Sequence, residues 1–170
     1  LLAWGTASPD DLGWLDPPPA GAFEQARALL ADLGAVDDQG KITDHGRRMA
    51  DLPLHPRLAH MLLAARQAGM GHAACEVAAI LGERDPLHFA GANRDADLRL
   101  RLDLLRAAKA HRPMALPDAG VDNNALRQIL KVAALLRQRL GLEAQPQSPP
   151  DVGRLLAWAY PDRVACRRAG

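Results

Sequence analysis

Residues that favour β-strands are scarce in this sequence. Its 170 residues include only 6 valines, 3 isoleucines and 2 threonines, whereas they include 33 alanines and 28 leucines. β-Branched residues favour strands, and alanine and leucine favour helices. We therefore expect an all-α chain, and neither an all-β fold nor a doubly wound α/β fold.

Cysteines and long apolar runs are scarce as well. Cys75 and Cys166 form neither a disulfide framework nor a CxxC pair, which is typical of a reducing compartment, so we expect a cytoplasmic protein. No run of about 18 apolar residues occurs, so we expect no membrane-spanning segment. The chain begins at Leu1, with neither an initiator Met nor a signal peptide, and we expect it to be an excised part of something longer.

A large excess of positive charge is also lacking. The 18 arginines and 3 lysines face 20 acidic residues, which leaves a net charge of +1. A basic field over the whole surface therefore cannot be offered as evidence for nucleic-acid binding. Any site for a polyanion must be local.

The first 69 residues alternate helix signals with one turn-rich segment. The expected order is a short helix from Ser8, a helix over 22–33, a two-stranded hairpin over 35–42, a helix over 43–49 capped by Thr43, and a helix over 56–69. Helices around a small β-hairpin indicate a winged-helix-like module, although here the hairpin lies between helices rather than after the last one.

Beyond Gly71 the apolar spacing is helical throughout. We expect a buried helix over 73–81, a helix over 97–110 and a strong helix over 124–140, followed by a Pro/Gln/Ser linker over 143–150 and a short helix over 152–160. In helix 124–140 the inward row is Leu126, Ile129, Ala133, Leu136 and Leu140. Arg127, Lys131 and Gln138 lie on the opposite face.

Motifs for catalysis and cofactor binding are missing. The segment from Gly34 to Thr43 is a near miss of the phosphate loop GxxxxGK[ST], because Ile42 follows the lysine where Ser or Thr is needed. Each of the two serines precedes a proline, which gives little support for a catalytic serine nucleophile. His72 and Cys75 could form one pair of metal ligands, but no second pair completes a metal site. We therefore assign no catalytic residue, no metal site and no cofactor to this chain.

Arginine is the informative polar residue, because its guanidinium group can meet a phosphate with several N–H donors. The residues that we expect to contact phosphates are Arg94, Arg99 and Arg101, in a series that ends at Arg106, and Arg127 with Lys131 on helix 124–140. The alternative is that these side chains only cover solvated helix faces.

Several phrases of the sequence resemble the segment that follows the second RecA-like domain in DEAH-box helicases. They are WLDPPP at 14–19, LGA at 33–35, GKITDHG at 40–46 and LPLHPRL at 52–58. Within that family, LHPRL at 54–58 and LLAWAYPDR at 155–163 most resemble the bacterial HrpB-type branch.

The resemblance implies a winged-helix module over 1–69, a helical-bundle ratchet (helicase-associated) domain over 70–142, and a linker with the start of a C-terminal region over 143–170. It implies a non-catalytic accessory region of an ATP-dependent RNA helicase, with single-stranded RNA and the helicase's own RecA-like domains as partners. Because the ratchet of such helicases lines the RNA channel, the five basic residues become candidates for RNA contact. ATP and Mg²⁺ would bind the RecA-like domains, whose motifs do not occur here.

Two other functions remain open. A stand-alone winged-helix protein would read duplex DNA, but Asp37 and Asp38 at the tip of the expected wing would be repelled by phosphates. A helical protein-binding platform is compatible with the same pattern.

Overall fold

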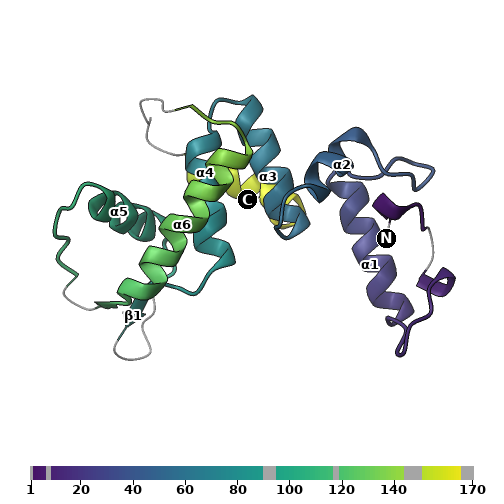
Figure 1. Cartoon of the computed structure of the whole chain (residues 1–170), viewed down its shortest axis with the longest axis horizontal. Coiled ribbons are helices and arrows are strands. Elements are labelled where there is room, and N and C mark those ends of the chain that lie inside the picture. Colours follow the sequence, from purple (N-terminus) through teal and green to yellow (C-terminus); the bar gives the residue numbers. More distant parts are fainter. Residues whose placement is uncertain (1, 7–8, 90–94, 117–118, 144–150, 166–170) are drawn as a thin grey trace, which may run out of the picture. The chain divides into compact units, whose positions relative to one another are not determined.

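The computed structural model describes residues 2–6, 9–89, 95–116, 119–143 and 151–165 (Figure 1). Most of these residues are helical, which confirms the expected fold class. The α-helices are α1 (Ala20–Asp32), α2 (Asp44–Ala50), α3 (Pro56–Gln67), α4 (Gly71–Gly82), α5 (Leu98–Lys109), α6 (Asn123–Arg139) and α7 (Val152–Ala159). Short 3₁₀ helices cover Leu2–Trp4, Pro9–Asp11 and Pro161–Arg163, and the strands are β1 (Leu87–Phe89) and β2 (Ala119–Val121).

The chain divides into two compact units. The first unit comprises Leu1–His60 with Ala159–Gly170, and the second comprises Met61–Trp158. The division falls inside α3, and the segment after α7 groups with the first unit. These units reflect packing alone, so the boundary that we expect between winged helix and ratchet, at residues 69 and 70, stays a prediction.

The first unit is built around the turn between α1 and α2. Thr43 caps α2 as expected, because its hydroxyl accepts a hydrogen bond from the N–H of Gly46 at 3.0 Å. A Cβ at Gly46 would lie 2.1 Å from the carbonyl oxygen of Ala35, so only glycine permits this close approach. This contact gives a physical reason for the Thr-x-x-Gly phrase.

The expected hairpin over 35–42 is shorter than a two-stranded ribbon. A single antiparallel bridge joins Val36 to Ile42. The carboxylate of Asp37 accepts hydrogen bonds from the N–H groups of Gln39 and Lys41, and α2 begins two residues after the bridge. Because the turn and the helix cap take up the neighbouring backbone groups, few residues remain for strand pairing.

The second unit is centred on α4, which packs against α5 and α6. Helix α4 is buried over most of its length, as its composition predicts. Asp97 caps α5 and Asp122 caps α6, and the inward row expected for α6 is buried. The alternating Leu/Arg stretch at 98–104 is thus helical, as expected.

Strands β1 and β2 form a two-stranded antiparallel sheet in the second unit, with Leu87 opposite Val121 and Phe89 opposite Ala119. Sequence analysis did not predict this sheet. Its strands are only three residues long and far apart in sequence, and β2 contains alanine and glycine, so no local preference announces them.

Candidate nucleic-acid interface

The outward face of α6 presents the basic pair expected from the sequence. Arg127 and Lys131 are both exposed and one turn apart, opposite the buried row of the helix. The guanidinium group of Arg127 donates a hydrogen bond to the side chain of Asn124, which holds it along the helix. Gln138 continues the exposed face, and Leu135 is 46% exposed beside it. This face offers two cations to a polyanion without disturbing the core.

Arg99 and Arg94 belong to the segment that leads into α5. Arg99 is exposed on the first turn of the helix, where its N–H donates to the cap residue Asp97 at 2.9 Å. Arg94 lies outside the described residues. Further along α5, Arg106 forms an ion pair with Asp103 at 3.6 Å. The Arg106 guanidinium group is therefore less available to a phosphate.

Arg101 departs from the expectation, because it is buried. Its side chain is 7% exposed, and its guanidinium group makes a two-pronged contact with the Asp85 carboxylate at 2.6 and 3.1 Å. It also donates to the carbonyl oxygen of Asp97 at 3.0 Å. Leu100 and Leu102 on either side share this turn, so sequence spacing alone does not show which residue faces inward. Arg101 holds the start of α5, and we leave it out of the proposed RNA contact.

The contact with Arg101 affects the pKa of Asp85. Partial burial by itself raises the pKa of Asp85, but the hydrogen bonds from Arg101 and from the N–H of Leu87 outweigh burial and leave its pKa below the ordinary value. The carboxylate therefore stays ionised, and the pair ties the segment after α4 to α5.

A second polar cluster inside this unit escaped sequence analysis. Glu76 of α4 is completely buried, and its carboxylate contacts the ammonium group of Lys109 on α5. The Arg137 guanidinium group of α6 lies 4.0 Å from the same carboxylate. The only signal in the sequence was a single acid in an otherwise apolar helix. Burial also raises the pKa of the neighbouring Cys75 thiol to about 12, so this thiol stays protonated.

Two phrases of the sequence meet in the first unit. Arg57, at the start of α3, makes a two-pronged contact with Asp162 at 2.5 and 3.0 Å, and also donates to the carbonyl oxygen of Ala159. The Arg57 guanidinium group holds the pKa of Asp162 below its ordinary value. Its guanidinium carbon lies 5.3 Å from the centre of the Tyr160 ring. The segments LHPRL and LLAWAYPDR are thus joined by direct contact.

A histidine pair links α2 to α3 in the same unit. Nε2 of His45 lies 2.9 Å from Nδ1 of His60, and the rings are edge to face. Burial lowers the pKa of both, and the neighbouring charges of His60 and Arg48 lower that of His45 further. One ring must accept the hydrogen bond, so the pair requires a neutral imidazole.

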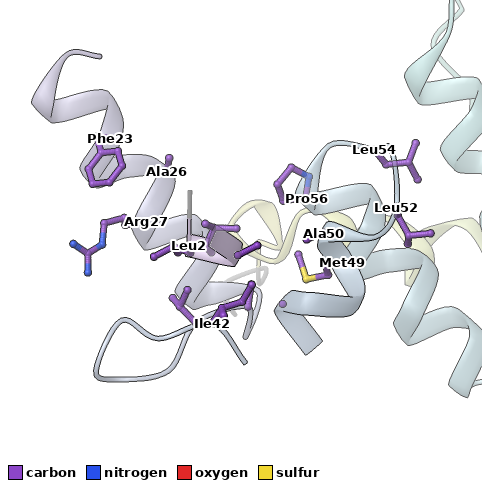
Figure 2. Close-up of a pocket in the computed structure, with 15 residues that line it drawn as sticks. Leu2, Phe23, Ala26, Arg27, Ile42, Met49, Ala50, Leu52, Leu54 and Pro56 are labelled. Carbon is purple, nitrogen blue, oxygen red and sulfur yellow. The ribbon is translucent and has the colours of Figure 1, made fainter. Parts of the chain in front are cut away.

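An apolar cavity of about 430 Å³ lies within the first unit. Figure 2 shows Phe23 and Arg27 of α1, Leu2, and Met49 of α2 around it. The described residues that line it include no acid, histidine, cysteine or serine, and Arg27 is the charged residue among them. Across the part of the chain that the structure describes, no three His, Cys, Asp or Glu side chains are grouped to hold a metal ion. Within the same ranges, no helix is long and apolar enough to cross a membrane.

Comparisons with known proteins agree with the resemblance in the sequence. Residues 26–54 match the family model described as "Helicase associated domain (HA2), winged-helix". The chain is 30% identical over 168 residues to the ATP-dependent RNA helicase HrpB of Escherichia coli, an alignment that covers 99% of this chain and 17% of that protein. It is 35% identical over 81 residues to the pre-mRNA-splicing factor ATP-dependent RNA helicase prp22 of Schizosaccharomyces pombe, covering 48% of this chain and 7% of that protein.

Solved structures share the fold as well. The crystal structure of the Escherichia coli DEAH/RHA helicase HrpB matches with a TM-score of 0.70 and 29% identity, over 98% of this chain and 18% of that one. A structure described as the E. coli DExH-box NTPase HrpB matches with a TM-score of 0.69 and 29% identity, over 99% and 18%. The chain therefore spans less than a fifth of these relatives. It carries a helicase-associated winged-helix domain at residues 26–54 and is homologous along its length to part of the DEAH/RHA helicase HrpB.

Proposed function

We propose that this chain is a non-catalytic accessory region of an ATP-dependent RNA helicase, and that its second unit contacts single-stranded RNA. The observation that carries the proposal is the outward basic face of α6, formed by Arg127 and Lys131. Arg99 on α5 of the same unit adds a third exposed cation. Cations on rigid helices can follow a phosphate backbone, whereas the side chains that pack these helices stay inside.

The remaining parts of the proposal follow from the homology. The RecA-like domains of the helicase are the second partner, and they are the parts that would bind ATP and Mg²⁺. The winged-helix part would act as a hinge between the motor and the ratchet. We also propose a cytoplasmic location, because the two cysteines of the sequence form neither a disulfide framework nor a CxxC pair, as is typical of a reducing compartment.

A charge reversal tests RNA contact. Arg127→Glu combined with Lys131→Glu should weaken binding of a short fluorescent oligouridylate, measured by anisotropy over a range of salt concentrations. Two lost phosphate contacts should make the slope of log K against log salt shallower by about 1.4, because fewer counterions are released. The free energy of unfolding should change by no more than about 0.5 kcal/mol, because both side chains are exposed.

Arg47→Glu with Arg48→Glu is the matched control. It makes the same change in charge at two exposed side chains of α2, in the first unit. Weakened binding in the control alone would favour contact through the winged helix. If RNA affinity and its salt dependence are unchanged in the α6 variant, Arg127 and Lys131 only cover a solvated face and do not contact RNA.

A further inference from the structure

The buried carboxylate of Glu76 lies where three helices meet. It projects from α4 toward Lys109 at the end of α5 and toward Arg137 near the end of α6. Glu76 is 0% exposed, whereas the side chains of Lys109 and Arg137 are 32% and 21% exposed. The Glu76 carboxylate on the central helix therefore forms an ion pair with a cation from each neighbouring helix: Lys109 is hydrogen-bonded to it, and Arg137 lies 4.0 Å away without a hydrogen bond.

This arrangement is unusual for a helix as apolar as α4. The other buried residues of α4 are alanine, cysteine, glycine, valine and isoleucine. A buried ion pair is often no more stabilising than an apolar replacement of similar volume. A buried charge that loses its partner is costly, however, so a packing that moves Lys109 out of reach of Glu76 is disfavoured.

Helix α5 is tied down at both ends. Near the start of α5, Arg101 binds Asp85. At the last residue of α5, Lys109 binds Glu76. Exposed Arg99 lies on the first turn of α5, two residues before Arg101. On α6, Arg137 follows Lys131 by six residues, about 9 Å along the axis. The exposed cations thus lie on the same two helices as the residues that contact Glu76.

We propose that Glu76 is a positioning residue that sets how α5 and α6 sit relative to each other, and thereby the spacing between Arg99 and the pair Arg127 and Lys131. The RNA consequence of this inference rests on the proposed function. The structural consequence does not, so the two are tested separately.

The structural test measures a distance between the two helices. Spin labels are attached to cysteines at exposed Asp103 of α5 and Gln138 of α6, with Cys166 replaced by serine; buried Cys75 remains. In the Glu76→Gln variant, the distribution of distances between the two labels, measured by double electron–electron resonance, should shift or broaden. The helix content, measured by circular dichroism, should stay the same. An unchanged, narrow distribution in the folded variant overturns the proposal.

A second variant keeps the test decisive if Glu76→Gln does not fold. The triple change Glu76→Leu, Lys109→Met and Arg137→Met replaces the whole cluster by apolar side chains, which commonly preserves stability. The distance distribution should still shift or broaden, because the charge requirement has gone. A triple variant with the original distribution would show that packing alone positions the helices, and would overturn the proposal.

The functional test measures oligouridylate affinity well below the melting temperature. Affinity should fall about threefold or more in the folded Glu76 variants, because mutations that do not touch a ligand can still change its binding by about this much. Glu83→Gln, at the end of α4 and outside the cluster, is the matched control and should bind normally. Changed distances with unchanged affinity would overturn the link to RNA. A wild-type chain that binds no oligouridylate would instead contradict the proposed function, while the distances still decide the role of Glu76.

Discussion

Single residues show that type and spacing do not settle a role. Arg99 and Arg101 are two residues apart on one helix, yet Arg99 is exposed and Arg101 is buried against Asp85. His45 of α2 and His60 of α3 are 15 residues apart, yet they form a hydrogen-bonded pair. In each instance the role depends on a partner that other parts of the chain bring into reach.

The histidine pair predicts a pH dependence of stability. Both pKa values are lowered in the folded state, so the folded protein favours neutral histidines. This contribution to stability is present above the ordinary pKa of about 6.5 and is lost as the pH falls through 6.5 toward the folded pKa values. The free energy of unfolding, from urea titration, should therefore fall between pH 7 and 5 more steeply in the wild type than in His45→Gln with His60→Gln. Parallel pH profiles would contradict this account.

Whole elements are held by a few ion pairs as well as by apolar packing. The start of α5 depends on Arg101 and Asp85, and the 3₁₀ helix Pro161–Arg163 depends on Arg57 and Asp162. In both pairs a planar guanidinium group meets both carboxylate oxygens, a geometry that lysine cannot reproduce. Such pairs hold short elements that bury little apolar surface of their own.

A double-mutant cycle tests the second of these pairs. Arg57→Lys and Asp162→Asn should each lower the melting temperature and speed proteolysis at residues 159–165 several-fold, because the segment opens more often when its tie is lost. The double variant should be little worse than either single variant. Additive effects would mean that the two residues act independently. Arg66→Lys, exposed on the same helix, is the control and should leave both measurements unchanged.

At the scale of the molecule, the chain is homologous to part of a larger helicase. Its polar clusters tie helices together, and its cavity is lined mainly by apolar side chains. It spans 17% of the E. coli HrpB helicase to which it is homologous.

The isolated chain should neither bind nor hydrolyse ATP. Hydrolysis requires a loop that cradles the phosphates and an acid that orders Mg²⁺, and the sequence has no phosphate-loop motif. Phosphate release in the presence of ATP and Mg²⁺ should equal that of a buffer blank, and a labelled ATP analogue should show no saturable binding. Turnover that persists at constant specific activity through further purification would disprove this prediction.

The sequence by itself determined what depends on neighbouring residues. Composition and spacing predicted the helices and the inward row of α6, and the cap at Thr43 followed from local hydrogen-bonding chemistry. The outward direction of Arg127 and Lys131 followed in the same way, because helical period alone places them opposite Leu126 and Ile129.

Only the tertiary structure decided what depends on distant residues. Asp162 is 105 residues from Arg57, and Glu76 is 33 residues from Lys109, so no local sequence pattern predicts either contact. The short pairing of β1 with β2 and the burial of Arg101 have the same origin. Helix preference acts within a few residues, whereas a buried charge is tolerated only where the folded chain supplies its partner.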